Sequence, residues 1–300
     1  MGGRGDPRPL PEESRAADVT LFGARFYGTD STTLLHNRIF LYSKIEPAQE
    51  AATRAIVDAI ERVFRRAGIL IAPDWRTTQI DEEHHMRRLL KHLAIDCVFD
   101  VGANVGQHAE KLRRYCEYSG LILSFEPNPA ALPQLRAAAS KDPLWEVFPI
   151  ALGKEKGSLP FQAYEDSKLG SLLQFDATSP HSPSDMKVST IQVDVETLAD
   201  FYPVLQEKYG FKRSFLKLDT QGFDLQAAMG AGKELQQFLG IQSEVTFAPI
   251  YDGAPKFDEV VAYYESHGFC LSRLFPNNDV HFPQLVEMDV VMVRTDQVKR

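Results

Sequence analysis

The sequence contains few cysteines and no strongly basic segment. Its three cysteines, Cys97, Cys116 and Cys270, include no Cys-x-x-Cys pair, so neither a disulfide framework nor a cysteine zinc site is expected. The net charge is −8 without a long basic run, which argues against a nucleic-acid partner because phosphate binding needs a basic surface. No apolar run approaches the roughly 20 residues of a membrane helix, and the first residues lack the apolar stretch of a signal peptide. We therefore expect a cytoplasmic protein without a membrane partner.

The composition is that of a globular protein. Hydrophobic residues make up 44% and charged residues 25% of the 300 residues, which allows a sizeable core in one large α/β domain or two small ones. Residues 1–18, rich in Gly, Pro, Arg and Glu, are predicted to form a disordered tail. Apolar periodicity predicts helices over 47–67 and 81–93, so residues 19–93 are predicted to form an N-terminal helical cap. Residues 94–300 are predicted to form the main domain.

From residue 96 onward, strand-like and helical segments alternate, which predicts βαβ units. The predicted strands are 96–101, 121–125, 146–151, 215–218, 241–247, 269–275 and 287–293. No helical pattern separates the last two, which is typical of an antiparallel pair. Strand-like pieces within 157–195 predict a β excursion at one sheet edge. The predicted fold class is α/β, with a doubly wound, mostly parallel seven-stranded sheet and an antiparallel last strand.

An acid and two spaced glycines follow the first predicted strand. Residues 98–107 read Val-Phe-Asp-Val-Gly-Ala-Asn-Val-Gly-Gln. Dinucleotide enzymes use Gly-x-Gly-x-x-Gly to bring the backbone against a pyrophosphate, whereas here Asp100 precedes Gly102 and Gly106 in Asp-x-Gly-x-x-x-Gly. A carboxylate at that position would repel a phosphate and suits a cationic ligand with an amino-acid end, such as S-adenosylmethionine. We predict cofactor contacts at Asp100, Gly102, Asn104 and Gly106; the alternative is a turn that needs glycine for packing alone.

A second acid follows the next predicted strand. Glu126 lies 20 residues past Gly106 and is followed by Pro-Asn-Pro. Its two carboxylate oxygens can accept both hydroxyls of a ribose. Asn128, in the same segment, is a second predicted cofactor residue. Leu152 follows the third strand, in a loop that often flanks adenine in this fold, and is a third. The alternatives are a solvated acid for Glu126 and plain packing for Leu152.

Charged residues interrupt the fourth and fifth predicted strands. Lys217 and Asp219 alternate in an apolar strand, so their side chains share one face, and buried charges are costly unless paired or used. Asp219, with Glu244 from the next strand, is predicted to act as a general base or to orient the acceptor. Lys217 is predicted to be catalytic with them, and Gln221, a polar residue at the same tip, is predicted to contact the cofactor. The alternatives are a structural Lys217–Asp219 pair, and capping or salt-bridging acids.

Four segments together resemble the FkbM family of methyltransferases: Phe99–Gln107, Phe125–Asn128, Thr197–Asp200 and Lys217–Leu225. The resemblance covers about residues 80–295. It implies a Rossmann-like methyltransferase domain that uses S-adenosylmethionine, with hydroxyls of macrolides or sugars as acceptors. It places the cofactor at Asp100, Gly102, Asn104, Gly106 and Glu126, and the reaction mouth at Lys217, Asp219 and Gln221. The family often has Glu where this chain has Asp224.

The predicted activity is O-methylation of a hydroxyl on a sugar or on a glycosylated or polyketide metabolite, without a metal. The predicted partner is a small-molecule or carbohydrate acceptor, and the oligomeric state is left open. Residues 157–195, the cap at 19–93 and the loop at 247–257 are expected to shape the acceptor pocket. Two alternatives remain: a non-catalytic cofactor-binding regulatory module, and a methyltransferase acting on nucleic acid or protein. Leu218-Asp-Thr-Gln221 lacks the Asn/Asp-Pro-Pro-aromatic tetrapeptide of many nucleobase enzymes, which argues against nucleic acid.

Overall fold

The computed structural model describes residues 20–21, 24–25, 38–41, 60, 64, 70–73, 77–182, 186–248, 250–276, 281 and 283–298. The chain divides into two compact units, one ending at Thr77 and one beginning at Thr78. In the first unit, β1 (Thr20–Leu21) pairs antiparallel with β2 (Ala24–Arg25), and β3 (Arg38–Leu41) pairs parallel with β4 (Leu70–Pro73). The predicted tail, and all of the predicted helix 47–67 except residues 60 and 64, lie outside the described residues.

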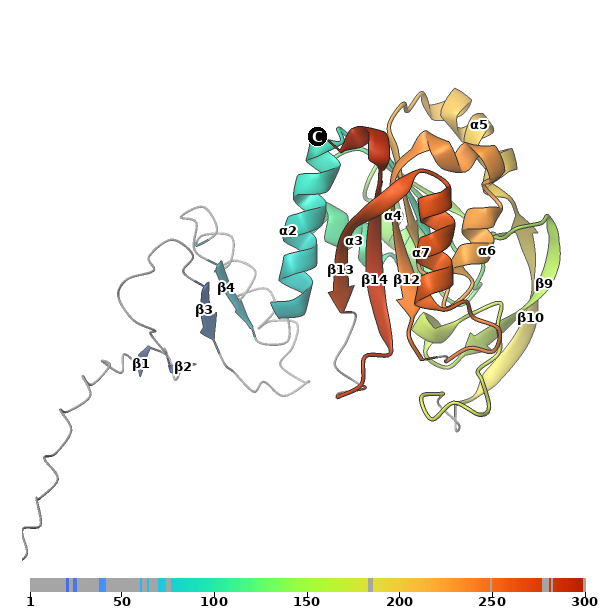
Figure 1. Ribbon diagram of the computed structural model, residues 1–300, viewed down its shortest axis with the longest axis horizontal. Helices are drawn as coiled ribbons and strands as arrows, with labels where there is room; N and C mark the ends of the chain where they lie inside the picture. The colour runs from blue at the N-terminus through green and yellow to red at the C-terminus, as the bar shows by residue number, and fades with distance from the viewer. Residues whose placement is uncertain are drawn as a thin grey trace, which may run out of the picture. The chain divides into compact units, whose positions relative to one another are not determined.

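The second unit is built around a seven-stranded sheet (Figure 1). In spatial order the strands are β13 (Phe269–Pro276), β14 (Glu287–Arg294), β12 (Phe238–Thr246), β11 (Ser214–Leu218), β5 (Cys97–Val101), β6 (Leu121–Phe125) and β7 (Trp145–Phe148). All neighbours are parallel except β14, which is antiparallel to both β12 and β13. The predicted fold class is therefore confirmed. The strand order reverses between β5 and β11, and ligands bind at the carboxyl ends of strands beside such a reversal.

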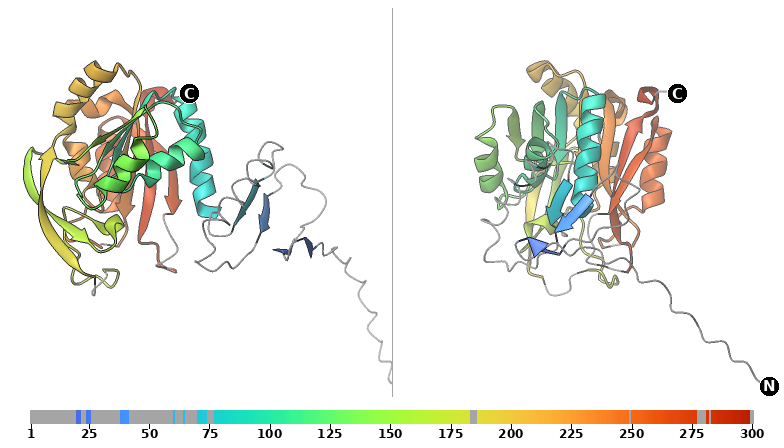
Figure 2. Two further views of the ribbon diagram at one scale, coloured as in Figure 1. Left: turned by 180° about the vertical axis from the view of Figure 1, so that it is seen from behind. Right: turned by 90° about the vertical axis from the view of Figure 1, so that its left-hand side faces the viewer.

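Helices cover both faces of this sheet (Figures 1 and 2). One face carries α2 (Thr77–His92), α3 (Gln107–Arg114) and α4 (Leu132–Ala139), and the other carries α5 (Leu198–Tyr209), α6 (Asp224–Met229) and α7 (Phe257–Ser266). Helix α2 begins four residues before the predicted start at 81. Helix α5 begins after Thr197, whose side chain caps it by accepting a hydrogen bond from the Asp200 N–H at 3.2 Å. No helix in the described part of the chain is long and apolar enough to cross a membrane.

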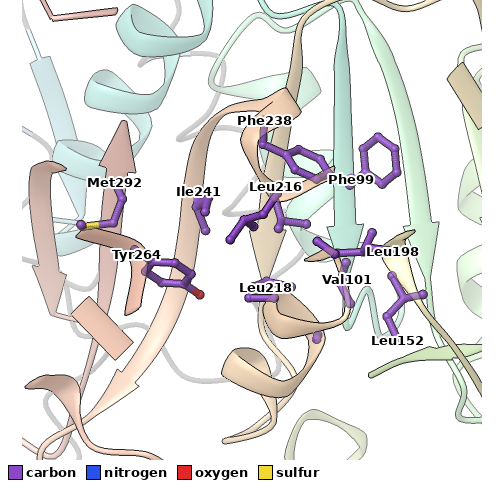
Figure 3. Packing of buried hydrophobic residues seen from close by; sticks show 14 of the residues in the cluster. Phe99, Val101, Leu152, Leu198, Leu216, Leu218, Phe238, Ile241, Tyr264 and Met292 are labelled. Atoms are coloured by element: carbon purple, nitrogen blue, oxygen red, sulfur yellow. The ribbon is translucent and has the colours of Figure 1, made fainter. Parts of the chain in front are cut away.

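Side-chain alternation gives the two faces of the sheet different chemistry. In β5, Cys97, Phe99 and Val101 point toward α5, whereas Val98 and Asp100 point toward α3. The α5 face is apolar, and Figure 3 shows part of its packing around Phe99, Leu216, Ile241 and Met292. The α3 face carries a row of polar side chains near the carboxyl ends of the strands. The buried charges Asp100 and Lys217 thus lie on one face, beside the edge where ligands bind.

The chain between β7 and α5 forms a separate three-stranded sheet. Strand β10 (Val188–Glu196) lies between β8 (Ala151–Leu152), to which it is parallel, and β9 (Gly157–Tyr164), to which it is antiparallel. The prediction of one strand over 146–151 is wrong, because the chain leaves the main sheet after Phe148 and Pro149 has no N–H for strand pairing. The predicted excursion is present, but as a sheet of its own. A short helix, η3 (Ser167–Leu169), follows β9; η4 (Gly232–Gln237) and η5 (Thr295–Gln297) lie farther along the chain.

Replacing Phe99 by alanine tests the apolar core. Phe99 is fully buried and its ring lies 5.6 Å from that of Tyr202 and 5.1 Å from that of Phe238. We expect Phe99→Ala to lower the free energy of unfolding by about 3–5 kcal/mol, because the substitution leaves a cavity among rigid rings. Urea unfolding followed by circular dichroism measures this, with the exposed Val204→Ala in α5 as control, for which a change below about 0.5 kcal/mol is expected. A loss below about 1 kcal/mol for Phe99→Ala would contradict this packing.

Candidate active site

The loop between β5 and α3 lies against two neighbouring strand ends. The N–H groups of Gly102 and Ala103 donate to the carbonyl oxygen of Phe125 at 3.0 and 3.1 Å. Gly102 has a φ of +78°, and a Cβ there would come within 1.9 Å of the carbonyl oxygen of Asp219. Only glycine allows this approach. The first predicted cofactor loop therefore touches the strand tip that carries Asp219.

Glu126 lies at the tip of β6 and holds two loops together. Its Oε2 accepts the Asn104 N–H at 2.6 Å and its Oε1 accepts the Asn128 N–H at 2.7 Å. Asn128 in turn caps the next segment, because its Oδ1 accepts the Ala130 N–H at 3.0 Å. Burial raises the pKa of Glu126 to about 7, although both backbone hydrogen bonds favour the ionised form. Each carboxylate oxygen retains a lone pair for a further donor.

A chain of polar contacts runs across the sheet below its carboxyl edge. Trp145 Nε1 donates to Ser124 Oγ at 2.9 Å, and Ser124 Oγ donates to Asp100 Oδ2 at 3.1 Å. Lys217 Nζ lies 3.6 Å from Asp100 Oδ1 and donates to Asp219 Oδ2 at 3.1 Å. We refer to Trp145, Ser124, Asp100, Lys217 and Asp219 as the polar row. It joins the strand of the cofactor loop to the strand of the predicted catalytic acid.

Lys217 is the cation between two carboxylates of the row. Asp100 is fully buried, and burial raises its pKa although Lys217 and Ser124 lower it. Burial also disfavours the Lys217 ammonium, but the Asp219 and Asp100 carboxylates outweigh this effect and raise its pKa above the usual value. The Lys217–Asp219 pair considered as a structural alternative is therefore formed, and it lies at the carboxyl edge.

Gln221 connects the two predicted catalytic acids. Its backbone is left-handed, with a φ of +55°, and its Nε2 donates to Asp219 Oδ1 at 2.9 Å and to Glu244 Oε2 at 3.0 Å. Its Oε1 accepts the Tyr251 hydroxyl at 3.0 Å, and its carbonyl oxygen accepts the Ser171 hydroxyl at 2.8 Å. Gln221 thus lies with Asp219 and Glu244, whereas Glu126 lies with Asn104 and Asn128. Ser171 brings the excursion to the same place.

Sequence reasoning missed a second polar cluster beneath α2. Glu82 Oε1 accepts Lys111 Nζ at 2.7 Å and Gln242 Nε2 at 2.9 Å, and Gln242 Nε2 also lies 3.2 Å from Asp289 Oδ2. Burial and the nearby Glu82 raise the pKa of Asp289 to about 8. A signal was available, since Gln242 and Asp289 are polar residues inside otherwise apolar strands, as is Ser124 in β6.

Two remaining residues have packing or bracing contacts. Leu152 is 1% exposed and its side chain lies in the apolar core, as Figure 3 shows, which agrees with the packing alternative for this residue. Asp224 Oδ1 accepts both the N–H and the hydroxyl of Thr220 at 2.9 Å, which fixes the loop after β11. Among the described residues, no group of three or more His, Cys, Asp or Glu side chains is arranged to hold a metal ion.

Residues 100–271, more than half of the chain, match the family model described as the methyltransferase FkbM domain. The chain belongs to the FkbM methyltransferase family. This assignment makes it a methyltransferase of the S-adenosylmethionine-dependent class. The matched range contains the cofactor loop, Glu126, the polar row, Gln221 and Glu244. No curated protein matches the chain in sequence.

Solved structures resemble this FkbM domain only distantly. The FkbM methyltransferase from Methylobacillus flagellatus KT is 12% identical, with 78% of this chain and 70% of that chain covered and a TM-score of 0.43. The magnesium protoporphyrin IX methyltransferase of Synechocystis PCC 6803, solved with bound S-adenosylmethionine, is 10% identical, with 83% of this chain and 100% of that chain covered and a TM-score of 0.37. Fibrillarin from Aeropyrum pernix, which also holds S-adenosylmethionine, is 8% identical, with 66% of each chain covered and a TM-score of 0.36. The family assignment rests on the match to the domain model and not on these structures.

The role of Lys217 in the FkbM domain can be tested by removing its charge. Lys217→Met leaves Asp100 buried without its cation, and we expect a loss of about 3–5 kcal/mol of unfolding free energy at pH 7.5. The loss should be smaller at pH 5. Burial raises the pKa of Asp100, so in the folded variant this carboxyl takes up a proton at lower pH and no longer leaves an unpaired buried charge. Urea unfolding at both pH values measures the difference. Lys154→Met, at an exposed lysine, is the control; an equal loss at both pH values would contradict the electrostatic explanation.

Proposed function

We propose that the protein binds S-adenosylmethionine at the tips of β5 and β6 and transfers its methyl group to a hydroxyl of a carbohydrate or of a glycosylated or polyketide metabolite. The observation that carries this proposal is the contact between Gly102 and the Asp219 carbonyl oxygen. It brings the cofactor loop directly against the tip where Asp219, Gln221 and Glu244 meet. A donor site and a pair of carboxylates are thus neighbours at one edge of the sheet.

The residues around the first loop suit this cofactor. Among the described residues, Asn104 Oδ1 is a buried oxygen without a hydrogen-bond partner, and so is Asp100 Oδ1, whose ion-pair partner Lys217 Nζ lies 3.6 Å away. They are acceptors, as the amino group of the cofactor requires, and the carboxylate also suits its positive charge. Glu126 has lone pairs available for ribose hydroxyls. When bound, S-adenosylmethionine supplies a methyl group on a positively charged sulfur, which leaves as a neutral thioether.

The reaction mouth supports a hydroxyl acceptor. Asp219 and Glu244 are carboxylates that can orient a hydroxyl or take its proton, and alignment of donor and acceptor supplies much of the rate in such a transfer. Lys217 holds Asp219 in place, and Gln221 holds both acids. Phe247 stacks on Phe257 with 4.9 Å between ring centroids and is 39% exposed, so an aromatic surface is available to an apolar ring face.

Segments far apart in the sequence surround the same mouth. The Tyr251 hydroxyl, besides its contact with Gln221, lies 3.0 Å from the carbonyl oxygen of Leu169, and Phe175 forms an isolated β-bridge with Tyr251. The excursion and the loop after β12 therefore meet beside β11. Tyr251 is buried and braces the loop, so Phe247 is the better of the two aromatics for contact with the acceptor.

The cofactor site can be tested by calorimetry with S-adenosylmethionine and S-adenosylhomocysteine. Glu126→Ala removes a hydrogen-bond acceptor for the ribose and two loop contacts, so we expect a loss of about 3 kcal/mol or more of binding free energy, which is at least a 100-fold higher Kd. Gly102→Val should also abolish binding, because its side chain would collide with the backbone of residue 219. Glu146→Ala, at an exposed acid in β7, should bind as the wild type does. Unchanged affinity in both site variants, or preference for NADH, would refute this site.

Labelling decides the acceptor class. The protein is incubated with S-adenosylmethionine labelled in its methyl group and with separate panels of glycans, glycosylated polyketides, RNA and proteins. We expect label in hydroxyl-bearing glycans or glycosides. Asp219→Asn should cut turnover about 100-fold or more, because a group that orients the acceptor is lost, with cofactor affinity nearly unchanged. Label found only in RNA or protein would overturn the acceptor assignment. Cofactor binding without transfer to any panel would favour the regulatory alternative.

A further inference from the structure

The two carboxylates at the reaction mouth share one amide donor but have different surroundings. Gln221 Nε2 lies 2.9 Å from Asp219 Oδ1 and 3.0 Å from Glu244 Oε2. The second oxygen of Asp219 accepts the Lys217 ammonium at 3.1 Å. Both oxygens of Asp219 are therefore engaged by donors, one of which is positively charged. A carboxylate in this situation is strongly held as the anion and is a weak base.

The charges around Asp219 favour its ionised form. Its side chain is 42% exposed, so water can reach it. Its partial desolvation opposes ionisation, but the Lys217 charge and the hydrogen bonds from Gln221 and Lys217 outweigh this effect and lower the pKa of Asp219 below its usual value. Lys111, farther along the same face, acts in the same direction.

Glu244 lies among acids instead. It is directly opposite Asp289 in the antiparallel pairing of β12 with β14, and Thr246, two residues on, is opposite Glu287. Directly paired residues share a face of the sheet, so both acids of β14 flank Glu244. Burial and the surrounding carboxylates of Asp219, Glu287, Asp289 and Asp224 raise the pKa of Glu244 well above its usual value.

We propose that Glu244, and not Asp219, takes the proton from the acceptor hydroxyl, with Asp219 as a permanent anion and Gln221 as the residue that positions both. The proposal rests on the function proposed above. The acceptor oxygen forms a bond to the methyl carbon as the carbon–sulfur bond breaks and its electron pair stays on sulfur. The hydroxyl proton passes to the Glu244 carboxylate, which becomes a neutral carboxylic acid. A stronger base is the better partner for a weakly acidic hydroxyl.

Gln221 is suited to this positioning role because its amide orientation is set from both sides. Tyr251 donates its hydroxyl to Oε1, so Nε2 must face the two carboxylates. The left-handed backbone at Gln221 is uncommon for a residue other than glycine, and the Ser171 hydroxyl on its carbonyl oxygen helps to hold it. The amide therefore keeps Asp219 and Glu244 at a defined separation, although both are negatively charged when ionised.

The dependence of rate on pH separates the two acids. Initial rates of S-adenosylhomocysteine formation are measured from pH 5 to 10, with methyl glycosides as acceptor probes. In the wild type, activity should rise with pH as Glu244 loses its proton. Glu244→Gln should lower kcat about 100- to 10,000-fold and abolish this rise.

The other site variants should only shift the pH at which activity rises. Asp219→Asn should keep the rise in activity but move it to lower pH, because a negative charge beside Glu244 is gone. Gln221→Ala should move it to higher pH, since a donor to the ionised Glu244 is lost, and the exposed Glu265→Gln should change nothing.

The opposite pattern would overturn the proposal: the rise is lost in Asp219→Asn and only shifted in Glu244→Gln. A second measurement needs no acceptor. The side-chain carboxyl carbons of Asp and Glu are labelled with ¹³C, and the complex with S-adenosylhomocysteine is titrated by NMR, with Glu244 and Asp219 assigned from the signals missing in Glu244→Gln and Asp219→Asn. Glu244 should titrate at higher pH than Asp219, and the reverse order refutes the assignment. If no methyl glycoside is methylated, the proposed acceptor class fails while this titration still decides between the acids.

Discussion

One buried ammonium group holds the active edge of this protein together. Lys217 comes from a central strand and lies between a fully buried carboxylate on β5 and a half-exposed one at the tip of its own strand. Its charge lowers the pKa of both Asp100 and Asp219 and so opposes the effect of burial on each of them. Asp100 is the last residue but one of β5, just before the glycine loop, and Asp219 opens the loop after β11, so the same charge joins the starts of the two loops that meet at Gly102. The contacts of Lys217, together with the close approach of Gly102 to the Asp219 backbone, thus hold the cofactor loop against the reaction mouth.

The two faces of the sheet have different roles: one forms the apolar core, and the other carries the polar residues of the site. The face toward α5 is a continuous set of interlocking apolar and aromatic side chains, and it includes Phe99, Tyr202 and Phe238. The opposite face is apolar only toward the amino ends of its parallel strands and polar toward their carboxyl ends. A rigid, dry layer on one side allows costly charges on the other, because the strands that carry Asp100 and Lys217 are anchored by their neighbours in sequence.

Much of this arrangement could be predicted from the sequence. Period-two alternation and apolar strands indicated the sheet, and the spacing from Gly106 to Glu126 indicated the two loops that Glu126 joins. The end of β7 was missed because a two-residue strand, Ala151–Leu152, continues the apolar pattern beyond Pro149 into a different sheet. The contacts of Gln221 and of Glu82 with Gln242 could not be foreseen, since they join residues 23 and 160 positions apart and depend on which strands become neighbours. Pattern shows which residues face inward, but not which of them meet.

The position of β14 has a consequence for how the sheet is assembled. Strand β13 precedes β14 in the chain, yet β14 lies between β12 and β13, and within the described residues β13 pairs with no other strand. In this order of strands, β13 joins the sheet only through β14. Strand β14 also carries Glu287 and Asp289. The same strand thus attaches β13 to the sheet and supplies part of the acidic surroundings of Glu244, so a change that displaced β14 would alter the sheet edge and the charge at the reaction mouth together.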